Sequence, residues 1–194
     1  MSSNDNKDTE TQGKEIVRKR RPIKAYLSEN AFMDLLLSSA EVFKKESLGY
    51  LLGYRLEDRF IIEHAFPLQS AERRPRGVVF HHRNHKKIQP ILSKFEKLQI
   101  IGDFHSHTQF GDTKGLPIPS PEDIKGMEPE NLYLIVAIND LEHSRPWREN
   151  RDGSISGSLG DFFFKISAYF FPHTDAIPLR VRIYCPFPPG LNVE

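Results

Sequence analysis

The chain has little cysteine, little net charge and no long apolar run, and each shortage excludes a class of protein. The single cysteine, Cys185, excludes an internal disulfide and every zinc site that requires two thiolates. A net charge of +1 gives no bulk electrostatic reason to expect nucleic acid or a membrane as a partner. No segment approaches the roughly 20 apolar residues of a membrane span, and the N-terminus lacks the apolar core of a signal peptide. We therefore expect a protein of the reducing cytoplasm.

The first residues of the chain are poor in apolar side chains. Residues 1–14 contain no aromatic residue, and Met1 is their only apolar one. They cannot repay the entropy of ordering, and a basic run follows at residues 18–21. The run could be an import signal or a patch for an acidic partner, although a solvated flank before the first strand is the simpler interpretation. We expect a disordered, basic tail over residues 1–21 and a single domain over residues 22–194.

Apolar periodicity predicts strands that are interleaved with a few helices. Strands are expected over residues 23–27, 47–55, 59–68, 76–82, 99–107, 131–139, 161–171 and 177–185, and helices over residues 29–45, 84–98 and 120–127. Ser28 is a suitable N-cap for the first helix, and Pro90 is expected to kink or stagger the second. Residues 148–160 are rich in Gly, Ser and charge and predict a turn or a mobile loop. This pattern indicates a mixed α/β sandwich.

Two histidines end one of the apolar runs, in the segment "IIGDFHSH". Side chains at i and i+2 of a strand point to the same face, so His105 and His107 can reach one metal ion. Asp103 shares that face and could orient a ligand or simply face solvent. A His-x-His pair alone is weak evidence for a metal, because two ordinary polar residues at a strand end have the same spacing.

The segment "SPED" follows after a loop rich in Gly and Pro. Ser120 is a suitable N-cap, and Asp123 can reach back to it, so the segment alone predicts only a helix start. Next to the histidines, however, Asp123 could complete a tripod of three protein ligands. Three ligands leave zinc a fourth position for water, whose pKa the metal lowers to about 7. Glu46, between the first helix and an apolar strand, is then a candidate general base.

The segments "ESLGYLLG" from Glu46, "HSH" from His105 and "SPED" from Ser120 together resemble the JAB/MPN family of zinc metalloproteases and its JAMM motif. The resemblance implies a cytidine-deaminase-like α/β/α sandwich around a mixed sheet. It implies that His105, His107 and Asp123 hold Zn²⁺, that Glu46 activates water, and that Ser120 stabilises the oxyanion. The implied activity is cleavage of ubiquitin or ubiquitin-like proteins from lysine, or processing of related tails, with zinc-bound water as the nucleophile.

Two departures from the family pattern concern the segment after the second histidine. The family usually has proline where this chain has Thr108, and residues 108–119 make a longer loop before the serine than is usual. This loop could be a mobile flap that orders on substrate, or a rigid loop pinned by its prolines. Thr108 and Phe110 in the loop are candidate substrate-binding residues. So are Arg73 and Arg74, which begin a basic segment that is either a dock for an acidic partner or a solvated surface.

Other classes of protein fit the sequence less well. A nucleoside deaminase requires His-x-Glu and Cys-x-x-Cys, a thermolysin-like protease requires His-Glu-x-x-His, and a TIM barrel requires about 250 residues. The serious alternative is a non-catalytic MPN-type scaffold for protein interactions. Such scaffolds have typically lost ligands, whereas here all five positions of the motif are filled. The oligomeric state does not follow from the sequence.

Overall fold

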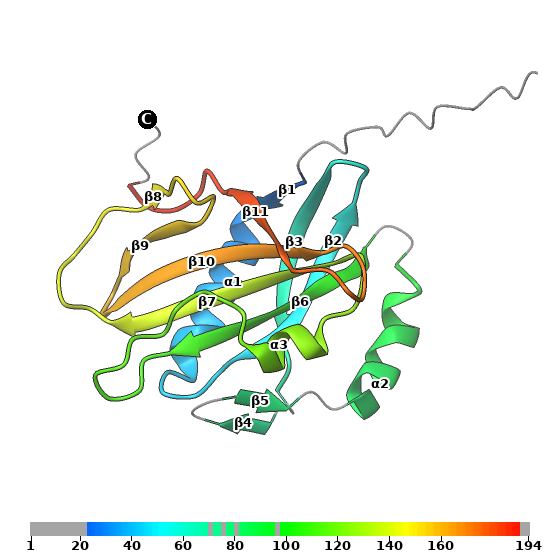
Figure 1. Ribbon diagram of the computed structural model, residues 1–194, viewed down its shortest axis with the longest axis horizontal. Helices are drawn as coiled ribbons and strands as arrows, with labels where there is room; N and C mark the ends of the chain where they lie inside the picture. The colour runs from blue at the N-terminus through cyan, green and yellow to red at the C-terminus, as the bar shows by residue number, and fades with distance from the viewer. Residues whose placement is uncertain (1–22, 70–71, 75–76, 80–81, 96–97, 191–194) are drawn as a thin grey trace, which may run out of the picture.

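The computed structural model describes residues 23–69, 72–74, 77–79, 82–95 and 98–190 (Figure 1). The tail expected over residues 1–21 lies outside this range. The strands are β1 (Lys24–Leu27), β2 (Leu48–Arg55), β3 (Arg59–Pro67), β4 (Glu72–Arg74), β5 (Gly77–Val79), β6 (Gln99–Thr108), β7 (Asn131–Asp140), β8 (Arg148–Glu149), β9 (Ile155–Leu159), β10 (Phe162–Phe171) and β11 (Leu179–Tyr184). The helices are α1 (Glu29–Glu41), α2 (His82–Leu92) and α3 (Pro121–Gly126).

One mixed sheet organises the described residues. Its nine strands follow the order β11-β1-β3-β2-β6-β7-β10-β9-β8, and β4 and β5 form a separate hairpin. β6 runs parallel to β7, and β1 runs parallel to β3 and β11, whereas β2 is antiparallel to both of its neighbours. β11 also pairs with the C-terminal half of β10, so the sheet curls back on itself. In this strand order, β2, β6 and β7 lie in the middle of the sheet.

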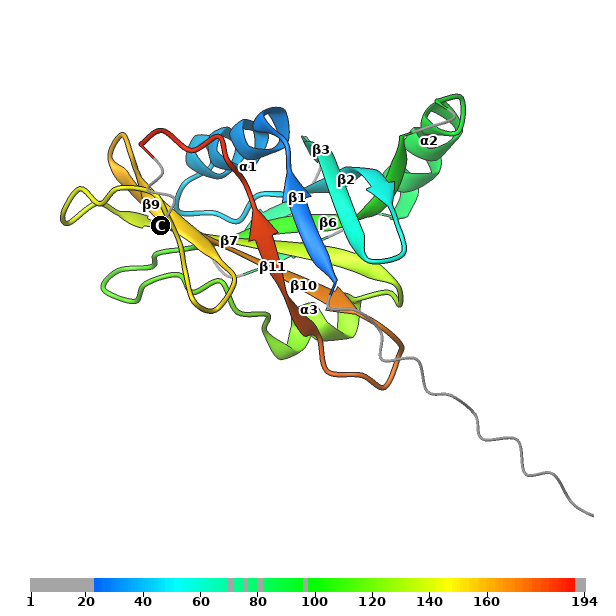
Figure 2. The same cartoon turned by 90° about the horizontal axis from the view of Figure 1, so that it is seen from above.

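Helices pack on both faces of the sheet (Figure 2). On one face, α1 buries Leu35 in the main core together with Phe104 of β6. On the other face, Met127 at the end of α3 packs with Tyr133. Ile88 of α2 packs there against the β2 side chains that point away from α1, which include Tyr50. The expected α/β/α sandwich around a mixed sheet is confirmed. The opposite face from α1 carries the candidate site.

Helix α1 begins at its predicted cap but ends earlier than its apolar pattern predicts. The Oγ of Ser28 accepts a hydrogen bond from the N–H of Ala31 at 3.1 Å. The helix ends at Glu41 instead of residue 45, because Lys44 adopts a left-handed backbone with φ 78°. The N–H of Lys44 donates to Oγ1 of Thr108 at 3.1 Å and thereby ties this turn to the end of β6.

The prediction of a turn or mobile loop over residues 148–160 is wrong in part. Strands β8 and β9 occupy this segment, and β9 pairs with the first half of β10. The sequence does not indicate strand β9 because it has a glycine, Gly157, where the Trp147 ring packs against the backbone. A Cβ at Gly157 would lie 2.5 Å from that ring. Glycine is depleted in strands and reads as a loop signal, so this tertiary contact overrides the local propensity.

Two other segments differ from their predicted boundaries. Helix α2 spans residues 82–92 instead of 84–98, and contains Pro90. Tight i to i−3 hydrogen bonds, such as Phe95 to Leu92, replace the helix after its last residue. In place of the single strand predicted over residues 76–82, the structure has the β4–β5 hairpin. Only β5, residues 77–79, falls within the predicted range. No helix in the described ranges is long and apolar enough to span a membrane.

A bulge in β6 determines which side chains reach the site. Leu51 pairs with Gly102 and Leu52 pairs with Ile100, so Ile101 is an extra residue in the strand. Gly102 has φ 155°, and a Cβ there would collide with the carbonyl oxygen of Leu132 in β7. After the bulge, even-numbered residues face α1 and odd-numbered residues face the site.

We expect Gly102→Ala to lower the free energy of unfolding by about 3 kcal/mol, because the new Cβ must displace the β7 backbone. For a chain of this size this corresponds to a fall in melting temperature of about 6 °C or more. Gly126→Ala is the matched control, since a Cβ there meets nothing within 4 Å. Equal melting temperatures for the two variants would show that the β7 backbone accommodates a side chain at position 102 without cost.

Candidate metal centre

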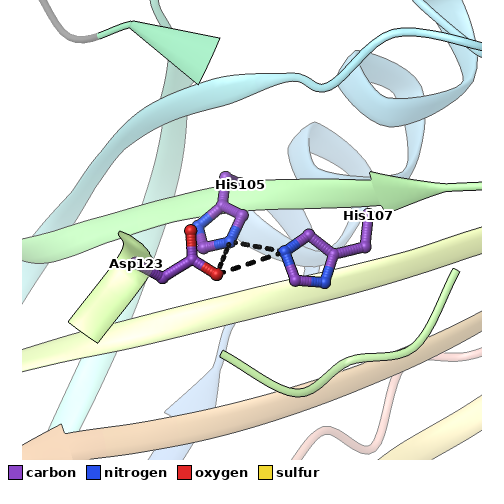
Figure 3. Close-up of side chains that lie close together, drawn as sticks. All are labelled: His105, His107 and Asp123. Atoms are coloured by element: carbon purple, nitrogen blue, oxygen red, sulfur yellow. Dashed lines mark hydrogen bonds and ion pairs between the residues drawn. The ribbon is translucent and has the colours of Figure 1, made fainter. Parts of the chain in front are cut away.

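The first two residues of the site come from β6. Leu48 of β2 and Ile135 of β7 pair with His105, which places this histidine in the middle of the sheet. His105 is only 6% exposed, and its Nε2 lies 3.0 Å from Nε2 of His107 (Figure 3). The structure therefore brings the two imidazoles together, as their spacing on one strand predicts.

The third residue, Asp123, comes from the first turn of α3. The N–H of Ser120 donates to Oδ2 of Asp123 at 2.6 Å, and the N–H of Asp123 donates to Oγ of Ser120 at 3.1 Å. This reciprocal pair is a capping box, with Pro121 at the first helical position. The same Oδ2 lies 3.4 Å from Nε2 of both His105 and His107. The cap thus holds the carboxylate against the two imidazoles.

The spacing of these three side chains fits a tetrahedral metal ion. Bonds of about 2.05 Å at a tetrahedral angle separate two ligand atoms by about 3.3 Å. The three distances here are 3.0, 3.4 and 3.4 Å. Within the described ranges, no other group of three His, Cys, Asp or Glu side chains is spaced to hold a metal. His105, His107 and Asp123 could therefore bind one metal ion and leave a fourth position open.

The tautomer of His107 suits this role. Its Nδ1 lies 2.7 Å from the carbonyl oxygen of Leu116. A carbonyl can only accept, so Nδ1 carries the proton and donates it. In the neutral ring the lone pair then belongs to Nε2, the atom that faces His105 and Asp123. A metal-binding histidine typically donates its second N–H in this way.

Electrostatics couple the Asp123 carboxylate to the His107 imidazole. Burial alone would raise the pKa of Asp123, but hydrogen bonds from His105 and His107 hold it well below its usual range. Burial alone would lower the pKa of His107, but the Asp123 carboxylate and the Leu116 carbonyl outweigh it and raise this pKa. The cluster therefore already attracts positive charge at the position where a cation would bind.

Asp103 lies on β6 two residues before His105, and its side chain is on the same face of the sheet as the two histidines. It pairs with Tyr50 of β2 on one side and with Tyr133 of β7 on the other. Burial is the largest cause that raises its pKa to about 7, and the carboxylates of Asp123 and Glu128 add to it. Asp103 is half-buried between these two tyrosines, and its role in orienting a metal ligand stays a prediction.

Glu46 precedes β2 and lies near His107. The N–H of Ser47 donates to Oγ of Ser106 at 2.8 Å, and the N–H of Ser106 donates to the carbonyl of Ser47 at 3.0 Å. This pairing continues the β2–β6 ladder by one residue and brings Glu46 level with His107. The charge of Glu46 contributes to the raised pKa of His107, which agrees with this proximity. Its role as a base stays a prediction.

The four candidate substrate-binding residues lie in different environments. Thr108 is 8% exposed, and its hydroxyl faces Lys44 and supports the turn before Glu46. Phe110 is 52% exposed in the loop that follows β6. Arg73 and Arg74 belong to β4, and their side chains lie outside the described part of the structure. Substrate contact by any of the four stays a prediction.

The loop over residues 108–119 is anchored close to the metal centre. The side chain of Asn139 makes hydrogen bonds to both the N–H and the carbonyl of Gly115, at 2.8 and 3.2 Å. The hydroxyl of Tyr169 donates to the carbonyl of Pro117 at 2.7 Å. These contacts favour a rigid second half of the loop, held by side chains of β7 and β10; pinning by the prolines stays a prediction. Asn139 and Tyr169 do not stand out in the sequence, where their only signal is a polar group on an otherwise apolar strand.

Comparisons with known proteins agree with this geometry. A family model described as prokaryotic homologs of the JAB domain matches residues 28–150. This range contains Glu46, His105, His107, Ser120 and Asp123. The solution structure of protein DSY2949 from Desulfitobacterium hafniense matches with a TM-score of 0.59 and 18% sequence identity, and the match covers 83% of this chain and 92% of that chain. At this identity the likeness shows the fold alone. No curated protein matches the chain.

Proposed function

Because the chain belongs to the family of prokaryotic homologues of the JAB domain, we propose that it is a zinc-dependent peptidase or isopeptidase. Its substrates in this proposal are ubiquitin-like small protein modifiers, which it releases from conjugates or processes at their tails. The observation that carries the proposal is the triangle of His105, His107 and Asp123, whose ligand atoms have the spacing of a tetrahedral zinc site with one open position.

Zinc suits this donor set of two imidazoles and a carboxylate, and when bound it lowers the pKa of water to about 7 and polarises a carbonyl. Glu46 accepts a proton from the attacking water and passes it to the departing amine nitrogen. The water oxygen would bond to the carbonyl carbon and the C–N bond would break, and the second water proton would follow the first to the nitrogen, so that a carboxylate and an ammonium leave. The Ser120 hydroxyl oxygen accepts a hydrogen bond from the backbone N–H of Asp123, so its own hydrogen can be donated to the developing oxyanion.

Apolar side chains beside the metal centre support a protein substrate. Phe110, Leu116 and Ile118 are 52, 59 and 54% exposed, and all three belong to the loop over residues 108–119. Leu116 also lines a pocket of about 210 Å³ with Phe163 of β10. An extended tail with apolar side chains can bury these surfaces as it crosses the site.

The proposal is tested with a ubiquitin-like modifier joined to a dye-labelled lysine peptide through an isopeptide bond. Release of the peptide lowers its fluorescence polarisation, and we expect zinc-loaded protein to release it and a chelator to stop the release. The alternative is a non-catalytic scaffold of the MPN type. Zinc-loaded protein that binds such conjugates and leaves them intact across a panel of modifiers would support the scaffold.

Ser120→Ala is expected to reduce turnover by about 10²-fold, because it removes the proposed oxyanion donor. It also removes an N-cap and should lower stability by about 1 kcal/mol. Turnover and melting temperature are measured on the same sample to separate the effects. Ser120→Thr, which keeps both the cap and the hydroxyl, is the control. Turnover within twofold of wild type for Ser120→Ala would mean that the serine serves as a helix cap and nothing more.

The proposal also includes a cytoplasmic location and no nucleic-acid or membrane partner. A single buried thiol, Cys185, and the near-zero net charge support this part.

A further inference from the structure

The loop over residues 108–119 lies on β6 at the metal ligand His107. A Cβ at Gly115 would collide with the carbonyl oxygen of His107, so the backbones of the loop and the strand are in close contact there. The next residue, Leu116, accepts the hydrogen bond from Nδ1 of His107 at 2.7 Å. The orientation of this imidazole therefore depends on where the loop holds one carbonyl group.

Two side chains from neighbouring strands hold the backbone on either side of that carbonyl. Asn139 of β7 is 5% exposed. Its Oδ1 accepts from the N–H of Gly115 at 2.8 Å, and its Nδ2 donates to the carbonyl of Gly115 at 3.2 Å. Tyr169 of β10 is 5% exposed and donates its hydroxyl to the carbonyl of Pro117 at 2.7 Å. Leu116 thus lies between two fixed residues.

The Tyr169 contact is itself braced from β11. Nη2 of Arg180 donates to the hydroxyl oxygen of Tyr169 at 2.6 Å, and Nη1 of Arg180 lies 2.6 Å from Oδ2 of Asp152. Lys165 of β10 pairs with the same carboxylate at 3.1 Å. The phenol is therefore fixed at its oxygen as well as by its buried ring.

From these contacts we infer that Asn139 and Tyr169 are positioning residues for the metal centre, which act on His107 through loop residues 115–117. They fix the Leu116 carbonyl, which holds Nδ1 protonated and aims Nε2 at the metal position. The inference rests on the proposed function in that a metal must bind at His105, His107 and Asp123. It assigns the extended loop a role in the metal site, distinct from that of a flap over the substrate.

The test measures the zinc affinity of the metal-free full-length protein by competition with a chelating dye. Partners that orient a metal ligand typically contribute 10-fold to 100-fold to metal affinity. We expect Asn139→Ala and Tyr169→Phe each to weaken zinc binding by about tenfold or more. Tyr169→Phe keeps the buried ring and loses only the hydroxyl, so it provides the test if Asn139→Ala does not fold.

Asn150→Ala is the matched control for a merely structural loss. Asn150 is a partly buried asparagine that makes hydrogen bonds to Ser154 and Ser156, away from the loop. We expect this variant to lower the melting temperature of the metal-free protein and to leave zinc affinity within twofold of wild type. The visible spectrum of the Co²⁺-loaded protein is a second readout, and it should change in Asn139→Ala and Tyr169→Phe only.

Two results would overturn the inference, and they are distinguishable. If wild type binds zinc and both loop-anchor variants bind it equally tightly, the inference fails and the proposed function is unaffected. If wild type itself binds no zinc, the proposed function fails and the inference with it.

Discussion

Glu46→Gln is expected to reduce hydrolysis by about 10³-fold while zinc stays bound. The amide cannot accept the proton of the attacking water, and a positioned general base typically contributes 10²-fold to 10⁴-fold. The three proposed ligands are untouched by the change, so zinc content should match wild type. The measurement pairs turnover on an isopeptide-linked conjugate with metal analysis of the same sample.

Glu41→Gln is the matched control, because Glu41 is an exposed glutamate at the end of α1 in the same region of the chain. It should hydrolyse at the wild-type rate. Turnover by Glu46→Gln at the wild-type rate would mean that Glu46 is only a surface carboxylate. Loss of zinc from Glu46→Gln would point instead to a role in holding the metal.

His107→Ala is expected to lose most of its zinc, and all hydrolysis with it. The variant keeps His105 and Asp123, and two protein ligands seldom hold a catalytic zinc. It also leaves the Leu116 carbonyl without the imidazole N–H that now binds it. We expect zinc affinity to fall by more than about 100-fold, as measured by competition with a chelating dye.

His173→Ala controls for the general effect of removing a histidine, since His173 is exposed in the connection between β10 and β11. Its zinc content should equal that of wild type. If His107→Ala still bound zinc at wild-type affinity, the triangle of His105, His107 and Asp123 would not be the metal site.

The three side chains of the candidate metal centre could be predicted from the sequence because local rules position each of them. Alternation along a strand puts His105 and His107 on one face, and the capping box of "SPED" turns Asp123 back toward Ser120. Both predicted geometries are present in the structure. Their meeting is suggested by the closeness of the two segments in the chain and implied by the family resemblance, since neither local rule says where α3 lies relative to β6.

The features that sequence reasoning missed depend on contacts between distant segments. Strand β9 reads as a loop because Gly157 makes room for Trp147, which no local pattern records. The anchors Asn139 and Tyr169 reach the loop across 24 and 52 residues of sequence. The turn after the early end of α1 likewise makes a contact with a distant segment, since the N–H of Lys44 donates to the Thr108 hydroxyl.

The most direct test of the proposed metal centre is the metal content of the wild-type protein, purified without chelator and measured by native mass spectrometry. We expect one zinc ion per chain, and loss of that ion from Asp123→Ala. Full-length, folded protein that carries no metal and takes up none from added zinc would contradict it.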